Sequence, residues 1–170
     1  AQGGMADVED PAPVALCRAH AKGLGMVWCL VEQKAAQARL AAHHGYYVPL
    51  AVKIAPDLQD EDIEYIAEQL VEHRIDGVIA TNTTIGRSGI ESLALASETG
   101  GLSGKPLKAL SNYTLARLCQ ALAGRIPVIG VGGIMDGPGA ADKIAAGASL
   151  VQVYTGFIYA GPGLIADAVQ

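Results

Sequence analysis

The chain has 170 residues, 51% of them hydrophobic, and a formal net charge of −5 at pH 7. That length suffices for one domain with a substantial core, while the acidic balance argues against a nucleic-acid partner, which normally requires a basic surface. No apolar run approaches the roughly 18 residues of a membrane-spanning helix, and the first residues lack the order of a signal peptide, so we expect neither.

The first half of the chain contains two helical patterns and one strand pattern. Residues 1–28 mix Gly, Ala, Asp and Pro without a sustained period, and we expect a weakly structured or divergent segment there. Strong helix formers occupy 29–44 and are followed by a glycine that stops the helix. A strand is predicted over 48–55. The clearest helix is 60–73, where apolar residues form one stripe and three acidic residues occupy the first turn.

The second half repeats the alternation of strand and helix. Residues 77–83 are nearly all apolar, as in a strand that is buried on both faces of a sheet. A glycine-rich loop of about twenty residues follows, and loops of this length usually build or cover a binding site. The remaining predicted elements are a helix over 107–123, a strand within 125–134, a helix over 136–146, a strand within 147–157 and a last helix from about Pro162.

This alternation predicts the fold class. Strands that alternate with helices normally pair in parallel and are joined by right-handed crossovers. A complete (β/α)8 barrel takes about 250 residues, so we predict an α/β fold that is a partial TIM barrel of about four parallel strands with flanking helices. Because such a sheet has two open edges, we also expect possible self-association of the chain through them.

Two glycine-bearing turns end the last two predicted strands. The first contains Gly132 and Gly133, and the second follows Tyr154 and Thr155. Turns of this kind present unpaired backbone N–H groups at the carboxyl ends of parallel strands, where they can hold a phosphate group. In β/α barrels the phosphate site usually lies after the last two strands. The alternative is ordinary turn geometry, for which glycine is common.

Five motifs occur together in an order and spacing that resemble the quinone-dependent (class 2) dihydroorotate dehydrogenases. They are KIAPDL (53–58), GVIATNTT (77–84), GGLSG (100–104), IPVIGVGGI (126–134) and GASLVQVYTGFIY (147–159). The resemblance runs from about residue 36 to the C-terminus. It implies that residues 29–170 form the C-terminal half of an FMN-dependent barrel, which oxidises dihydroorotate to orotate in pyrimidine (UMP) biosynthesis.

Lys53 is the residue with the most evident chemistry. It lies inside an apolar strand, and a buried ammonium without a partner is costly, so a counter-charge or a ligand is indicated. The alternative is a side chain that reaches solvent from the strand end. The resemblance implies that Lys53 contacts the isoalloxazine ring of FMN and stabilises negative charge on the reduced flavin.

The resemblance also implies roles for residues at the ends of the other strands. The FMN-binding set is Lys53, Thr81, Gly104, Gly133, Tyr154 and Thr155, the last three being around the phosphate. Asn82 and Thr83 would bind orotate, which suits an Asn side chain with two donors and one acceptor. The alternatives are ordinary turn chemistry for the Thr and Asn residues and simple packing for Tyr154.

Several features of the family are not expected within this sequence. The resemblance puts the catalytic base, a serine, before the lysine strand, but the first serine here is Ser88. We therefore expect no catalytic base in this chain and no turnover by the chain alone. Cys17 and Cys29 are interpreted as packing residues rather than substitutes. The resemblance further implies a quinone as electron acceptor and a peripheral location on the cytoplasmic face of the cell membrane.

No metal site is expected. The three cysteines contain no CxxC pair and favour a reducing compartment, and the four histidines lack the spacing of metal ligands (His20, His43, His44 and His73). Two alternatives for the function stay open. One is another phosphate-binding FMN barrel enzyme, for example one that reduces uracil in RNA, and the other is a non-catalytic, truncated half-barrel.

Overall fold

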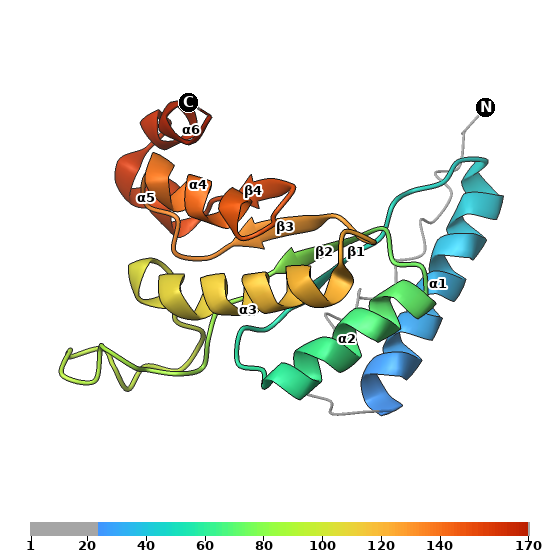
Figure 1. The fold of residues 1–170 in the computed structure, drawn as a ribbon, viewed down its shortest axis with the longest axis horizontal. Helices are drawn as coiled ribbons and strands as arrows, with labels where there is room; N and C mark the ends of the chain where they lie inside the picture. The colour runs from blue at the N-terminus through green and yellow to red at the C-terminus, as the bar shows by residue number, and fades with distance from the viewer. Residues whose placement is uncertain (1–23, 170) are drawn as a thin grey trace, which may run out of the picture.

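The computed structural model describes residues 24–169, in which four strands alternate with helices (Figure 1). The strands are β1 (Ala51–Ile54), β2 (Gly77–Ala80), β3 (Val128–Val131) and β4 (Leu150–Gln152). They form one sheet in the order β1-β2-β3-β4, and every neighbouring pair is parallel. The prediction of four parallel strands with flanking helices is therefore confirmed.

The helices lie between and around these strands. They are α1 (Leu24–His44), α2 (Asp60–Glu72), the short 3-10 helix η1 (Lys105–Leu107), α3 (Lys108–Leu122), α4 (Gly137–Ala145), α5 (Thr155–Ala160) and α6 (Gly163–Ala168). Helix α1 begins at Leu24 rather than at residue 29. The added first turn contains Leu24 and Met26, which are good helix formers. The expectations for Cys17, His20 and the rest of residues 1–23 lie outside the described part of the chain.

Helix α5 was not predicted; the sequence indicated only a strand within 147–157 that ends in a glycine-bearing turn. Strand β4 ends at Gln152, and the chain turns into a helix that begins at Thr155 and ends before Gly161, whose φ angle is positive (+65°). Phe157, Ile158 and Tyr159 favour strands by local propensity, which explains why no helix was predicted here. Tertiary contact overrides this preference, because Gly156 packs directly against the carbonyl of Ile134.

The register of the sheet shows which residues share a face. Lys53, Ile79 and Ile129 are neighbours in one row, and the next row places Ile54 beside Ala80. Successive side chains of a strand point to opposite faces, so these rows face opposite sides. Ile54 and Ala80 are fully buried in the core under the helices, whereas the row of Lys53 is only half-buried.

The core lies between the sheet and helices α2 and α3, which run side by side (Figure 1). The stripe predicted for α2 is buried as expected, and α3 contributes a second apolar face. The buried residues of these helices include Ile63, Ile66, Ala67 and Leu70 on α2 and Leu115, Leu118 and Leu122 on α3. Inside this layer the Thr114 hydroxyl donates to the carbonyl of Pro56 at 3.1 Å, which fixes the turn after β1.

The long loop after β2 is closed at its base and held together from within. Thr84 and Leu102 form an antiparallel bridge, and the Thr84 hydroxyl donates to the carboxylate of Asp57. The Arg87 guanidinium donates to five backbone carbonyls of the same loop, at 2.8 to 3.1 Å. The loop therefore projects from the body of the fold as an organised segment, visible between β2 and α3 in Figure 1.

Asp76 joins α1 to the start of β1. Its carboxylate accepts hydrogen bonds from the Leu50 N–H at 2.8 Å, from the Gln37 amide at 3.0 Å and from the Tyr47 hydroxyl at 2.5 Å. These donors, above all the Leu50 N–H, lower the pKa of Asp76 to about 2. The strand that carries Lys53 is thereby anchored at Leu50, the residue directly before its start.

Replacing Asp76 with Ala is expected to lower the free energy of unfolding by roughly 2 kcal/mol at neutral pH, because three donors lose a charged acceptor. The control is Glu64→Ala, which removes an exposed carboxylate 3.2 Å from Arg117 and should cost less than about 1 kcal/mol. Because the folded pKa of Asp76 is lowered, its contribution is complete above about pH 4 and is lost as the pH falls toward 2. Urea denaturation across this range measures both effects, and an undiminished difference at low pH would contradict the assignment.

Candidate functional site

A pocket of about 610 Å³, including the part open to solvent, lies at the carboxyl ends of the strands. All eight residues that the resemblance singled out line it: Lys53, Thr81, Asn82, Thr83, Gly104, Gly133, Tyr154 and Thr155. They come from the end of every strand and from the segment before η1, because parallel pairing brings the carboxyl ends of all strands to one edge. The structure thus brings the whole predicted set together, while the individual binding roles stay predictions.

The first corner, Gly132–Gly133, follows β3. Both residues have positive φ angles, +106° and +74°, which L side chains rarely adopt. A Cβ atom on Gly133 would collide with the backbone of Lys108, so the corner packs directly on the first residue of α3. Among residues 24–169, the N–H of Gly133 has no acceptor and remains available to a ligand.

The second corner, Tyr154–Thr155, follows β4 and faces the same pocket. The Thr155 hydroxyl donates to that of Ser103 at 2.9 Å, and a Cβ atom on Gly104 would lie 3.0 Å from the Thr155 methyl group. Because Gly156 also touches the Ile134 carbonyl, the two corners are in contact. Tyr154 is 74% exposed, so its side chain is not packed against the described part of the chain.

Ser103 is a site residue that sequence reasoning did not single out. It lines the pocket and pairs with Thr155, although it lies far from that residue in the sequence. The GGLSG motif contained the available signal, since Ser103 directly precedes a glycine with a φ angle of +76° that approaches Thr155 closely.

Lys53 lies on the pocket side of the sheet, opposite the helix layer. It is half-buried, and within the described part of the chain its ammonium has neither a hydrogen-bond acceptor nor a carboxylate partner. A cation that is half-removed from water without a partner is available to an anionic or strongly polar ligand. Of the two partners that the sequence indicated, a counter-charge or a ligand, the described residues supply no counter-charge, which leaves a ligand as the expected partner.

The end of β2 presents polar groups that are held in place by the backbone. The Thr81 N–H donates to the Val131 carbonyl at 3.0 Å and the Asn82 N–H to the Ile54 carbonyl at 2.7 Å, so these residues extend the sheet ladder. The Asn82 side-chain oxygen accepts from the Thr83 N–H at 3.0 Å. In this arrangement the two donors of the Asn82 amide remain available at the pocket.

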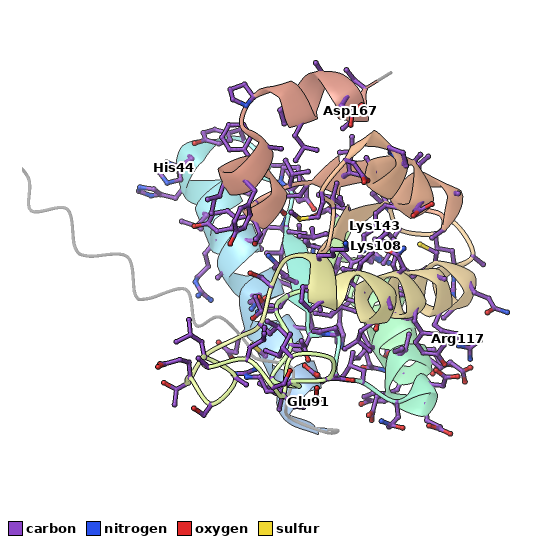
Figure 2. The ribbon with its side chains drawn as sticks, turned by 90° about the vertical axis from the view of Figure 1, so that its left-hand side faces the viewer. His44, Glu91, Lys108, Arg117, Lys143 and Asp167 are labelled. Carbon is purple, nitrogen blue, oxygen red and sulfur yellow. The ribbon has the colours of Figure 1, made fainter. Side chains whose placement is uncertain are left out.

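A second lysine near the site is buried. Lys143 of α4 is 1% exposed, and its ammonium donates to the Ser111 hydroxyl at 2.7 Å and to the Val131 carbonyl at 3.3 Å. The pKa of Lys143 is lowered to about 8, above all by burial and also by the neighbouring Lys108 ammonium, while Asp142 opposes the change. Figure 2 shows Lys108 and Lys143 close together near the start of α3.

Sequence reasoning missed Lys143 because a lysine in a short helix normally lies on the solvent side. The available signal was its spacing from Gly139 and Ala140, which are also buried on this helix. Gly130 on β3 makes room for it, since a Cβ atom there would lie 3.0 Å from the Cβ of Lys143.

No group of three or more His, Cys, Asp or Glu residues that could hold a metal occurs within residues 24–169. None of the helices that the structure describes is both long enough and apolar enough to cross a membrane.

Comparison with known proteins identifies the family to which the chain belongs. Residues 20–170 match the family model described as Dihydroorotate dehydrogenase, and the chain therefore belongs to the dihydroorotate dehydrogenase family. The match begins earlier than the motif resemblance, which starts at about residue 36.

Individual relatives agree with this assignment. The chain is 56% identical over 137 residues to the dihydroorotate dehydrogenase (quinone) of Shewanella woodyi, covering 81% of this chain and 40% of that protein. It is 58% identical over 134 residues to the enzyme of the same name from Nitrosospira multiformis, covering 79% and 38%. The resemblance to the quinone-dependent class is thus confirmed.

A solved structure confirms the fold. The chain superposes on the crystal structure of the Eimeria tenella dihydroorotate dehydrogenase in complex with ferulenol with a TM-score of 0.77 and 36% identity, covering 85% of this chain and 42% of that one. The partial barrel predicted from the sequence is consistent with this match. The chain spans about 40% of the length of the curated relatives that it matches.

Replacing Gly133 with Ala tests the first corner. Gly124 provides a matched control, because its φ angle of +76° equals that of Gly133 within a few degrees but its Cβ position is open. We expect Gly124→Ala to cost about 1 kcal/mol of unfolding free energy from backbone strain alone, and Gly133→Ala at least about 2 kcal/mol more from collision with the Lys108 backbone. Denaturant titration of both variants measures the difference, and equal costs would show that the corner is not tightly packed.

Proposed function

We propose that this chain supplies the cofactor-binding part of an FMN-dependent dihydroorotate dehydrogenase (quinone), which oxidises dihydroorotate to orotate in pyrimidine (UMP) biosynthesis. The observation that carries this proposal is the convergence of all eight resemblance-derived residues on one pocket. The identity of 56 to 58% with relatives that carry this name supports the same reaction class.

The chemistry of the pocket fits an FMN molecule. Gly133 offers an unpaired N–H and Tyr154 an exposed side chain. The Thr155 hydroxyl donates to Ser103, whose own hydroxyl hydrogen stays available, so this pair also suits the phosphate group. Lys53 and Thr81 line the pocket from β1 and β2, where the isoalloxazine ring would extend, and Gly104 lies against Thr155. When bound, FMN accepts a hydride from the substrate. The unpartnered ammonium of Lys53 would offset negative charge that develops on its ligand.

Orotate is the proposed ligand of the end of β2. The amide of Asn82 can donate to a carbonyl or carboxylate oxygen of the pyrimidine, and the Thr83 hydroxyl lies at the same end of the strand. Because the ladder bonds of Thr81 and Asn82 fix the backbone, these groups are pre-positioned rather than flexible.

The complete reaction requires groups beyond those assigned here. No serine precedes Ser88, so we infer that the proton-abstracting base is not supplied by this chain and that the chain alone does not turn over dihydroorotate. The electron acceptor proposed for the whole enzyme is a quinone, as in the names of the relatives. A quinone substrate favours a peripheral location at the cytoplasmic face of the cell membrane.

Self-association of the chain is also proposed. Strands β1 and β4 each have a single neighbour within the described sheet, and open parallel edges favour pairing with another chain. Several large apolar side chains are exposed on β4 and in α5, including Leu150, Ile158 and Tyr159.

Flavin binding tests the proposal directly. The purified 170-residue chain is expected to bind FMN with a flavin absorbance spectrum distinct from that of the free cofactor. Lys53→Ala should weaken the affinity about tenfold or more, equivalent to about 1.4 kcal/mol, because a partner of the ring is removed. Lys34→Ala is the control, since Lys34 lies on α1 outside the pocket. Equal affinity in the wild type and Lys53→Ala would remove the assigned role, and absence of any flavin binding would refute the proposal for this chain.

A further inference from the structure

The burial of Lys143 needs a physical explanation. Its ammonium is removed from water, and its two hydrogen-bond partners, Ser111 and Val131, are neutral. The nearest carboxylate, Asp142, is already paired with Lys108 at 2.9 Å. A buried cation with neutral partners only is costly, so an anion that binds nearby would relieve a cost that the free protein carries.

The partners of Lys143 connect it to the first corner. The Ser111 oxygen lies 2.9 Å from the Gly132 carbonyl and 3.1 Å from that of Lys108. A serine hydroxyl has a single hydrogen. Since Ser111 accepts from the ammonium, its own hydrogen points toward these carbonyls. A chain of hydrogen bonds thus runs from Lys143 through Ser111 to the corner that lines the pocket.

We propose that Lys143 is a positioning residue for the phosphate site, whose buried ammonium fixes the Gly132–Gly133 corner through Ser111 and strengthens the binding of a phosphate group there. This inference rests on the proposed function, because it concerns the cofactor phosphate of the same pocket. Lys143 does not line the pocket and is not assigned a contact with the ligand.

The electrostatic effect of the Lys143 ammonium is only weakly screened by solvent, because the side chain is buried. It touches the carbonyl of Val131, which itself lines the pocket, so one layer of backbone separates the ammonium from the site. Lys108, which faces Lys143 from α3, is neutralised by Asp142 and lies near Asp136. Because exposed charges are screened by salt and buried ones much less, Lys143 is the stronger source of positive potential.

The proposal predicts a link between pH and phosphate affinity. Because the pKa of Lys143 is about 8 in the free protein, the ammonium is mostly charged at pH 7 and mostly neutral at pH 9. A bound phosphate favours the charged form, so its affinity must fall as the pH rises through this interval, and binding at pH 8 must take up protons.

Comparison of FMN with riboflavin isolates the phosphate. Fluorescence titration at pH 7 and pH 9 would be carried out with the wild-type chain, Lys143→Met, Ser111→Ala and the control Lys34→Met. We expect Lys143→Met to weaken FMN binding about tenfold at pH 7 and to leave riboflavin unchanged. The wild type should lose a similar factor between pH 7 and pH 9, for FMN only. Ser111→Ala should weaken FMN binding less and keep its pH dependence, because the cation remains.

The outcomes separate this inference from the function on which it rests. If FMN binds but the wild type treats FMN and riboflavin alike across the pH range, the role of Lys143 is refuted and the flavin function stands. If neither flavin binds, thermal protection by inorganic phosphate replaces the titration. Protection of the wild type that is lost in Lys143→Met would then support the role of Lys143 in phosphate binding, although the flavin function fails. Equal protection of both proteins, or no protection of either, would refute that role. The wild-type pH dependence needs no variant, so it remains decisive if a variant does not fold.

Discussion

The contact between Gly133 and the backbone of Lys108 fixes the geometry of the whole pocket. It presses the turn after β3 onto the first residue of α3, and the neighbouring Gly156 presses the second turn onto Ile134. Both contacts exist only because no side chain intervenes at either glycine. The resulting corners face one cavity, into which parallel pairing also directs the ends of β1 and β2.

The distribution of charge around this cavity follows from the same arrangement. One face of the sheet is sealed by α2 and α3, and the other carries Lys53 with its ammonium unpartnered in the described chain. Lys143 lies behind the first corner, in a space that Gly130 leaves. Lys53 and Lys143 thus lie near the site on opposite faces of the sheet. This arrangement suits a ligand with a negatively charged group at one end and a polar ring at the other.

Much of the fold could be predicted from the sequence, because its signals are local. The stripe on α2 and the apolar runs of β2 and β3 reflect burial that each element undergoes by itself. Helix α5 could not be predicted, since its residues favour strands and only contact with Ile134 decides the outcome. The eight pocket residues were found through motif resemblance, whereas Ser103 and Lys143 depend on partners far away in the sequence.

The most direct test of the account is an amide nuclear magnetic resonance titration of the chain with FMN, with riboflavin as the reference ligand. Both flavins should shift signals near Lys53 and Thr81, whereas only FMN should shift the N–H signals of Gly133 and Thr155. That difference would locate the phosphate at the two corners. Equal shifts from both flavins at these residues, or phosphate-dependent shifts elsewhere in the chain only, would contradict the central claim.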